Sequence, residues 1–498
     1  MKRRAFLGTT LAGLGALLPG CGGGSGGGMG GSGMGGIMPG LPFAPGAALV
    51  PGLALRDLPK LANESALAGR FTASLAAAPS NTSLVEGRTT ALWLYNGLFP
   101  GPVVEVREGD RVRIALENRL PLDTTAHWHG LPVPADQDGN PMDPVRPGTT
   151  RVYEFDIPSG TAGTYWYHPH AHGTVAEQVS RGLAAPFIVR AANDPLAAIP
   201  EVTMLVTGIR LDGNGQVSPN GPLDFTMGRQ GEQLLVNGGR LPVHTVQPGA
   251  TQRWRILNAT SSRYLRLALD GHAFTLVGTD GGLLGAPVGP LAEIVVAPAQ
   301  RVEIVVAVTT APGARFTLRA LRHVSDTMGM GTYSSEDLLT LATTTAAPVA
   351  SIALPATLRP VVDPGPAVAA RRVVLTQSGM GMMGAMFGFL IDGRSFDMNR
   401  VDFVSTQGAV ETWEIVNDTF MDHPMHLHGT QFLLVSRESG GRVTPAPHAA
   451  WYDTVDVPAG TTATIKVRQD LPGRRMFHCH ILEHEDAGMM AVLEVRPG

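Results

Sequence analysis

The chain is poor in cysteine and in charged residues. Among its 498 residues there are two cysteines, only 16% of the residues are charged, and the net charge is -4. Cys21 belongs to the N-terminal leader described below, so Cys479 stands alone and no disulfide can form within the folded part. With no basic excess, nucleic acid is excluded as an expected partner. A lone thiol in an exported protein therefore needs an explanation other than cross-linking.

The N-terminus has the composition of an export signal. Lys2, Arg3 and Arg4 precede the apolar run AFLGTTLAGLGALLPG, which is too short for an ordinary transmembrane helix. The string RRAFL resembles a twin-arginine signal, so we predict a signal segment over residues 1–21 and export to the periplasm or cell envelope. The string LPGC resembles a lipoprotein cleavage box, which adds a lipid anchor at Cys21 as a further hypothesis.

The sequence shows no helical pattern of convincing length. It has 62 glycines and 39 prolines, and helix interiors tolerate neither residue well. Residues 22–59 form a Gly/Met/Pro-rich segment that we interpret as a linker. Beyond it, short strand-like runs such as VVEVREGDRVRIALEN are separated by PG, DG, GG and SG turns. This pattern predicts an all-β protein built from β-sandwiches.

Three strand-like runs repeat one pattern along the chain. In each, a glycine is followed nine residues later by an asparagine, in the runs EGDRVRIALEN, PGATQRWRILN and QGAVETWEIVN. At a fixed distance after each asparagine the sequence reads HWH, LAL and HLH, and a second slot reads HPH, LRA and HCH. The repeat predicts three similar domains near residues 60–192, 193–350 and 365–498. The middle domain lacks the histidine pairs, and we expect it to act as a spacer.

Ten of the 15 histidines fall in four short windows, HWHG, HPHAHG, HPMHLHG and HCHILEH. Histidines scattered over a surface or a core would not concentrate in this way. In a strand, residues i and i+2 point to the same face about 6.5–7 Å apart, which suits two adjacent metal ions better than one. Four H-x-H pairs, two from each outer domain, therefore predict a metal cluster between the first and third domains.

The residue inside the last H-x-H pair faces the other way. Because side chains alternate along a strand, Cys479 points away from its two flanking histidines. There it can meet His423 and His484, and Met489 can add a weak thioether ligand. A thiolate, two imidazoles and a distant methionine make a blue-copper electron-transfer set. A zinc site formed by His480 and His484 is the alternative, but it leaves Cys479 and the other windows unexplained.

The windows HWHG, YWYHPHAHG, HPMHLHG and HCHILEHEDAGMM resemble those of three-domain multicopper oxidases, which include laccases, bilirubin oxidases and bacterial copper-efflux oxidases. The resemblance spans nearly the whole mature chain. It implies three consecutive cupredoxin-like Greek-key β-sandwich domains and four copper ions per chain. The implied ligands are His127 and His426 for the type 2 copper; His129, His168, His170, His428, His478 and His480 for the type 3 pair; and His423, Cys479, His484 and Met489 for the type 1 copper.

The same resemblance implies an enzyme that oxidises its substrate one electron at a time at the type 1 copper. O2 would be reduced to two waters at the other three coppers, with Cys479 carrying electrons between the sites. That reduction consumes protons, and Asp138 and Glu485 stand at positions similar to the family's proton-relay acids. We expect a monomer. The alternative is a copper-free scaffold of the same fold, as among bacterial cell-division proteins, but such a chain should have lost its ligands.

Methionine-rich stretches bear on the substrate. The run GMGMMGAMFGF over residues 379–389 has four methionines, and TMGMG adds Met328 and Met330. Thioethers are soft donors suited to Cu(I), whereas methionine also fills gaps in apolar cores. Oxidation of Cu(I) for copper tolerance and laccase-type oxidation of phenols or aromatic amines are therefore both open hypotheses. Asp326, Glu336 and Asp337 are candidate additional ligands for a cation.

Overall fold

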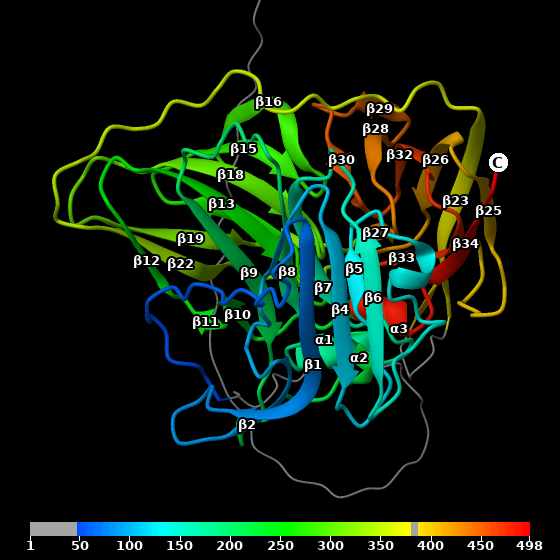
Figure 1. The fold of residues 1–498 in the computed structure, drawn as a ribbon, viewed down its shortest axis with the longest axis horizontal. Coiled ribbons are helices and arrows are strands. Elements are labelled where there is room, and N and C mark those ends of the chain that lie inside the picture. Colours follow the sequence, from blue (N-terminus) through cyan, green and yellow to red (C-terminus); the bar gives the residue numbers. More distant parts are fainter. Residues whose placement is uncertain (1–46, 380–386) are drawn as a thin grey trace, which may run out of the picture. The chain divides into compact units, whose positions relative to one another are not determined.

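The computed structural model describes residues 47–379 and 387–498. This part of the chain forms three pairs of β-sheets that follow one another in sequence, coloured blue to cyan, green, and yellow to red in Figure 1. The all-β prediction is therefore confirmed. The predicted signal segment, Cys21 and the methionines of residues 380–386 lie outside the described residues. No helix in the described part is long and apolar enough to cross a membrane.

The strands of each pair of sheets pair in the following orders. In the first pair, one sheet has the order β2 (Thr90–Tyr95), β1 (Arg70–Thr82), β4 (Arg111–Asn118), β6 (Thr150–Asp156). The other sheet has the order β3 (Val104–Arg107), β8 (Ala185–Arg190), β7 (Gly163–His168), β5 (His127–His129). In the middle pair, one sheet has the order β11 (Gly239–Arg240), β10 (Gln233–Val236), β9 (Glu201–Ile209), β13 (Thr251–Asn258), β18 (Arg301–Ala307), β15 (Phe274–Thr279), β16 (Gly282–Leu291). The other sheet has the order β12 (Val243–Val246), β22 (Glu336–Thr343), β19 (Arg315–Leu321), β14 (Leu265–Leu269), β17 (Ile294–Val296). In the third pair, one sheet has the order β24 (Gly388–Ile391), β23 (Ala369–Ser378), β26 (Val410–Asn417), β32 (Thr461–Arg468), β28 (Phe432–Ser439), β29 (Arg442–Pro445), and β30 (Trp451–Tyr452) also pairs with β28. The other sheet has the order β25 (Phe403–Thr406), β34 (Met490–Arg496), β33 (Gly473–Cys479), β27 (His423–Leu427), β31 (Thr454–Val457).

The three pairs of sheets share one pattern of strand pairing, although their strand numbers differ. Each contains two parallel pairings among otherwise antiparallel strands: β1 with β4 and β3 with β8, β9 with β13 and β12 with β22, and β23 with β26 and β25 with β34. This agreement confirms that the sequence repeat encodes three consecutive sandwiches. The domain boundaries inferred from it stay predictions.

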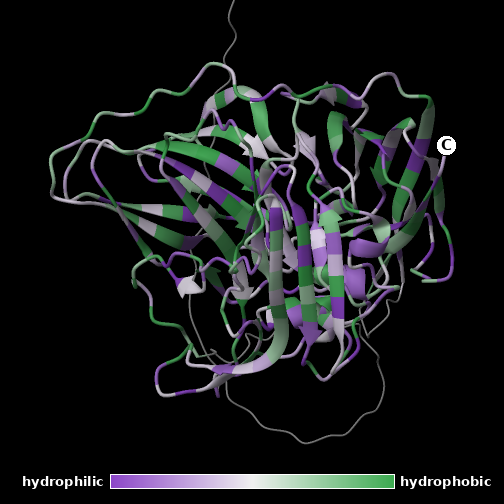
Figure 2. Ribbon diagram, in the orientation of Figure 1, coloured by the Kyte–Doolittle hydropathy of each residue, from purple (hydrophilic) through white to green (hydrophobic). Residues whose placement is uncertain are grey.

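Alternation of polar and apolar residues explains why these segments form strands. In β4, Val112 and Ile114 are buried while Arg111 and Arg113, which alternate with them, are exposed. Figure 2 shows the same alternation of hydrophobic and hydrophilic residues along the strands of the first sheets. Each pair of sheets encloses its own apolar core, around Trp128, Trp254 and Trp413 respectively. Removal of these apolar faces from water is the main favourable contribution to folding.

The repeated asparagine has the same structural task in all three copies. Asn118, Asn258 and Asn417 each end a strand, and each is buried. Their side-chain amides donate hydrogen bonds to two backbone carbonyls each, those of Leu122 and Val145, Arg263 and Val296, and Met421 and Val457. The first carbonyl of each couple lies a few residues before the strand that carries the HWH, LAL or HLH slot. The asparagine therefore anchors that strand to the opposite sheet.

The two slots of each repeat become neighbouring antiparallel strands. The outer copies align His127 with His168 and His426 with His478. In the middle copy Leu267, the first residue of LAL, lies opposite Ala320, the last residue of LRA. Because side chains alternate with a period of two, this shift of two residues keeps the same faces together. The pairing register of the middle copy therefore differs by two residues from that of the outer copies.

Three short helices and one turn complete the parts that surround the histidines. They are α1 (Val175–Ser180), α2 (Pro222–Met227), α3 (Leu482–Asp486) and the 3₁₀ turn η1 (Ala135–Gln137). Helix α3 contacts both α1 and α2. A small sheet of β20 (His323–Val324) and β21 (Thr332–Tyr333) lies in the middle third of the chain. At the other end, Leu55 of the predicted linker donates its N–H to Val243 at 2.8 Å.

Candidate metal centre

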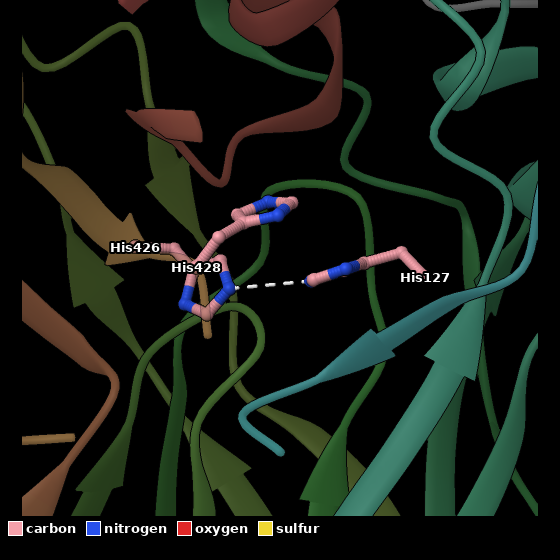
Figure 3. A group of neighbouring side chains, drawn as sticks. All are labelled: His127, His426 and His428. Carbon is pink, nitrogen blue, oxygen red and sulfur yellow. Dashed lines mark hydrogen bonds between the residues drawn. The ribbon is translucent and has the colours of Figure 1, made fainter. Parts of the chain in front are cut away.

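The eight histidines of the four H-x-H pairs gather at one buried place. They form three groups in which the ligand atoms lie within 4.8 Å of one another: His127, His426 and His428; His129, His168 and His480; and His170, His428 and His478. Every one of them is almost fully buried. Figure 3 shows His127 meeting His426 and His428 from the opposite side, with the Nε2 atoms of His127 and His426 3.4 Å apart.

In three of the four H-x-H pairs the two members belong to different groups, whereas His426 and His428 share the first group and His428 also joins the third. His478 joins His170 and His428, while His480 joins His129 and His168. The spacing along a strand thus separates the imidazoles over adjacent positions, as the sequence predicts. Since each group combines residues from the first and third pairs of sheets, neither pair could form a complete group alone.

Backbone carbonyls orient several of these rings. Four histidines have Nδ1 within 3.0 Å of a backbone oxygen: His127 with Asp138, His168 with Pro169, His426 with Asp453, and His478 with Cys479. A carbonyl accepts only a protonated Nδ1, so Nε2 of each ring keeps its lone pair. Outer hydrogen bonds of this kind fix ligand rings in metal sites.

The free nitrogens have the chemistry that a metal ion requires. Nε2 of His129, His168 and His480 is buried and has no hydrogen-bond partner, an arrangement that is costly unless something else binds there. Burial, and then the neighbouring imidazoles, lowers the pKa of all three rings well below the usual value. Neutral imidazoles with inward lone pairs suit copper. The donor set of this structure therefore fits copper.

A second group lies on the other face of β33. Sγ of Cys479 is 3.4 Å from Nδ1 of His423 and 3.8 Å from Nδ1 of His484. Burial raises the pKa of the Cys479 thiol, so a thiolate there requires a cation. Met489 is fully buried in the same apolar cluster as Cys479, and its backbone oxygen accepts the Cys479 N–H at 3.1 Å. The four residues predicted for the type 1 copper are thus brought together.

Helix α2 and a threonine cover the outer edges of these two imidazoles. Nε2 of His484 is 3.1 Å from the backbone oxygen of Thr226, and Nε2 of His423 is 2.9 Å from the hydroxyl of Thr419. Burial lowers the pKa of His484 to about 4. Both rings therefore direct Nδ1 toward the sulfur. The sequence carried no signal that α2 would cover His484.

The two predicted proton-relay acids both reach the histidine cluster. Asp138, after η1, has Oδ2 3.1 Å from Nδ1 of His428. Glu485 in α3 has its oxygens 3.4 Å from Nε2 of His170 and 3.3 Å from Nδ1 of His478. Burial, and then Asp486, raises the pKa of Glu485 well above its usual value.

The structure also places the residues of the zinc alternative and the three carboxylates that the sequence suggested as cation ligands. His480 precedes α3 and faces a different group from His484, so the zinc alternative is wrong. Asp326 accepts backbone N–H bonds from its own loop, whereas Glu336 pairs with Arg263 and Asp337 with Arg319. These three carboxylates are therefore engaged with different partners. Sequence reasoning missed Asp453, which contacts two of the clustered histidines and has no recognisable motif around it.

Comparisons with known proteins agree with this geometry. Three multicopper oxidase family models match residues 77–194, 162–337 and 368–498. The chain belongs to the multicopper oxidases, copper-binding oxidoreductases that use O2 and a reducing substrate. The outer and middle sandwiches described above are the cupredoxin-like domains of that family.

The chain is similar to several named members of the family. It is 30% identical over 438 residues to the multicopper oxidase mco of Staphylococcus aureus, covering 85% of this chain and 88% of that protein. The structure of a multicopper oxidase from Campylobacter jejuni, described as a metallo-oxidase, is 37% identical with a TM-score of 0.85 over 92% of this chain and 99% of the other. A laccase structure from Pediococcus acidilactici is 30% identical with a TM-score of 0.79, over 92% and 95%.

Proposed function

We propose that the chain binds four copper ions and couples one-electron oxidation of a substrate to reduction of O2 to water. The type 1 copper is held by His423, Cys479, His484 and Met489; the type 2 copper by His127 and His426; and the type 3 pair by His129, His168 and His480 and by His170, His428 and His478. One observation carries the proposal: Cys479 at the end of β33 belongs to one candidate site, and its neighbours His478 and His480 belong to the other.

Bound copper would supply the one-electron chemistry that joins the substrate to O2. The protein contributes the connection between the sites. Because Cys479 is covalently bonded to both His478 and His480, the shortest path between the two sites runs through three consecutive residues. Burial of all three excludes water from this path, and reactive species formed in the site are thereby protected from side reactions.

Two acids would handle the protons that O2 reduction consumes. Glu485 lies between His170 and His478, and burial favours its protonated form. It can donate a proton from a carboxyl oxygen toward the space that the imidazoles enclose. Asp138 contacts His428 and holds the Nδ1 proton of that ring. We assign Glu485 the role of proton donor and Asp138 a role in orienting the ring and accepting protons from it.

Cu(I) is the substrate that the surface best supports. Met328 and Met330 are exposed, at 53% and 38%. Their loop lies near the cysteine site, because the backbone of Asp326 forms an isolated β-bridge with that of Met421, two residues before His423. Soft thioethers at the surface bind Cu(I) in preference to hard cations. The similarity to a structure described as a metallo-oxidase supports the same choice. The methionines of residues 380–386 are proposed as further thioether donors for Cu(I).

Phenols and aromatic amines are the second candidate, because the chain is also similar to laccases. In the structure His484 is only 1% exposed and lies under α2. A bulky aromatic substrate would therefore have to donate its electron through α2 rather than touch the ring. This geometry predicts weaker activity on phenols than on a small ion bound at the surface.

Steady-state kinetics on Cu(I) and on a phenol test the substrate. Replacement of residues 380–386 by a Gly/Ser loop leaves in place Phe389 of β24, which packs on His423 and His484. This change, and separately Met328→Leu with Met330→Leu, should raise KM for Cu(I) and leave phenol oxidation unchanged. Met398→Leu is the matched control, since Met398 is 37% exposed outside this loop. If Cu(I) oxidation survives both changes unaltered, the methionine hypothesis fails.

Two features of the proposal concern the protein outside the site. Residues 1–21 are proposed to direct export to the periplasm or cell envelope, with lipid attachment at Cys21 as the second hypothesis, and the mature chain is proposed to be a monomer. Cell fractionation with Arg3→Lys and Arg4→Lys, and with Cys21→Ala, tests the first point. The alternative, a copper-free scaffold of the same fold, is disfavoured because every proposed ligand position has the expected residue type. A purified chain that binds no copper would support that alternative.

A further inference from the structure

The middle pair of sheets reaches the histidine cluster through one arginine. Arg301 begins β18, and its side chain is fully buried. A guanidinium has five N–H donors, and here five oxygens accept them: both carboxylate oxygens of Asp453, at 2.8 and 2.6 Å, and the backbone oxygens of Thr164, Asp280 and Ala299. Thr164 belongs to the first pair of sheets and Asp453 to the third. One side chain thus joins all three.

Asp453 extends this contact to two of the clustered imidazoles. Its Oδ1 lies 3.5 Å from Nδ1 of His129 and 3.6 Å from Nδ1 of His426. Its backbone oxygen lies 2.8 Å from the same nitrogen of His426. The two rings stack with their centroids 3.7 Å apart. Since His129 comes from the first pair of sheets and His426 from the third, one carboxylate touches both halves of the cluster.

Asp280, also in the middle pair of sheets, holds the backbone that carries Asp453. Its Oδ1 accepts the N–H of Arg301 at 2.7 Å, and its Oδ2 lies 3.3 Å from the backbone nitrogens of Asp453 and Thr454. The hydroxyl of Thr454 then donates to Oδ1 of Asp453 at 3.0 Å. Every residue of this network is buried. The position of Asp453 is therefore determined from two directions by the middle pair of sheets.

The chain leaves room for the ion pair at Gly130. This glycine follows His129 directly and has a φ of +87°. A Cβ at this position would lie 2.1 Å from Oδ2 of Asp453 and 2.8 Å from Nη2 of Arg301. Any larger residue would displace the pair. The glycine of the HWHG window is thus explained by the approach of Arg301 and Asp453, and not by metal binding itself.

We infer that Arg301 and Asp280 are positioning residues, which hold His129 and His426, and with them the two halves of the cluster, at the separation that copper requires. This inference rests on the proposed function. It also replaces the expectation that the middle domain is only a spacer. The competing explanation is an ion pair that stabilises the fold and does nothing more.

Arg253 provides a matched control for that explanation. It is a buried arginine of the same sheet, in β13, and it pairs with Glu303 and Asp194. Its described contacts include no histidine. A purely structural role predicts the same consequences for Arg301 and Arg253 variants, whereas a positioning role predicts changes at the copper site for Arg301 alone.

The test compares copper-loaded full-length Arg301→Gln, Arg301→Lys and Arg253→Gln. Loss of an outer partner of metal ligands typically costs about 10- to 100-fold in metal affinity or activity. Arg301→Gln should therefore lower kcat or the copper affinity of the cluster by that factor and change the type 2 EPR signal. KM for the reductant and the absorption due to Cys479 should be unchanged. Arg301→Lys should recover part of the loss, and Arg253→Gln should match the wild type in every one of these readouts.

Three outcomes decide against the inference. Arg301→Gln with wild-type copper content, EPR spectrum and kcat would overturn it, and so would equal spectral changes in Arg253→Gln. If Arg301→Gln does not fold because Asp453 is left as an unpaired buried charge, Arg301→Lys and Arg253→Lys replace the pair, and only the former should alter the EPR spectrum. A wild-type chain that takes up no copper would instead overturn the proposed function, and this inference with it.

Discussion

Two glutamates of one short helix give the proton-delivery proposal its sharpest test. Glu485 of α3 directs its carboxyl group toward His170 and His478, at 3.4 and 3.3 Å, and neither of its oxygens has a hydrogen-bond partner. Glu483, two residues earlier, is equally buried. Its oxygens, however, accept the backbone N–H of Arg229 at 3.0 Å and the amide of Asn220 at 3.1 Å.

The two Glu→Gln variants should have opposite consequences. Glu485→Gln breaks no hydrogen bond and preserves the shape, so the free energy of unfolding should change by less than about 1 kcal/mol. It removes the acidic proton, and a positioned acid contributes about 10²- to 10⁴-fold to a proton-transfer step. Reduction of O2 should therefore slow by about 100-fold or more. Glu483→Gln should leave that rate unchanged and cost about 1–3 kcal/mol, because an amide nitrogen replaces one of two accepting oxygens.

Stopped-flow reoxidation of the reduced enzyme by O2 measures the first quantity, and urea unfolding measures the second. Reoxidation isolates the oxygen reaction from electron donation by the substrate. Wild-type reoxidation by Glu485→Gln would refute the assignment of Glu485 as the proton donor. Equal slowing in both variants would show that any neutral amide in α3 disturbs the site, and the argument from the Glu485 contacts would be wrong.

Three further predictions concern the cysteine site, the repeated asparagine and pH. Cys479→Ser should abolish the blue colour and substrate oxidation, measured by visible absorption and O2 uptake; a blue, active variant contradicts the type 1 assignment. Asn417→Ala loses hydrogen bonds of 2.7 Å to Met421 and Val457 and should cost about 2–4 kcal/mol. It should also shift the blue band, because His423 follows Met421, whereas Asn258→Ala should cost as much without moving the band; identical spectra would refute the distinction. Burial, and then Asp422, raises the pKa of Asp456 from 3.8 to about 6, so the folded state holds this proton more tightly than the unfolded state. No stability is lost to it below about pH 4, and as the pH rises to about 6 the wild type should lose up to about 3 kcal/mol relative to Asp456→Asn; a gap in urea unfolding that does not change with pH refutes this.

The local parts of the fold could be predicted because they depend on neighbours in sequence. The Gly-x8-Asn runs identified β4, β13 and β26, since a strand that ends in a buried asparagine uses the same side-chain chemistry in each copy. Strand alternation alone placed Cys479 on the face opposite His478 and His480. The candidate ligands could be recognised in the sequence because imidazole and thiolate groups concentrated in four windows have few other uses.

The pairing registers of the strands, and the elements that pack over the candidate metal ligands, could not be predicted in the same way. The middle copy pairs Leu267 with Ala320, two residues away from the register of the outer copies, and a period of two cannot distinguish these registers. Nor did any pattern indicate that Thr226 of α2 would cap His484. Such contacts depend on how elements far apart in the chain pack together. Each of them involves a single residue whose neighbours in sequence form no recognisable pattern.

The amino-acid sequence therefore contains the identity of the candidate ligands and the strands that carry them, because both follow from residue type and a spacing of two along the backbone. Only the tertiary structure assembles three-histidine groups from the first and third sandwiches and places Arg301 and Asp280 of the middle one behind them. An arginine that starts an ordinary strand has no distinguishing neighbours in sequence. Its role arises from five acceptors that only the folded chain brings around it.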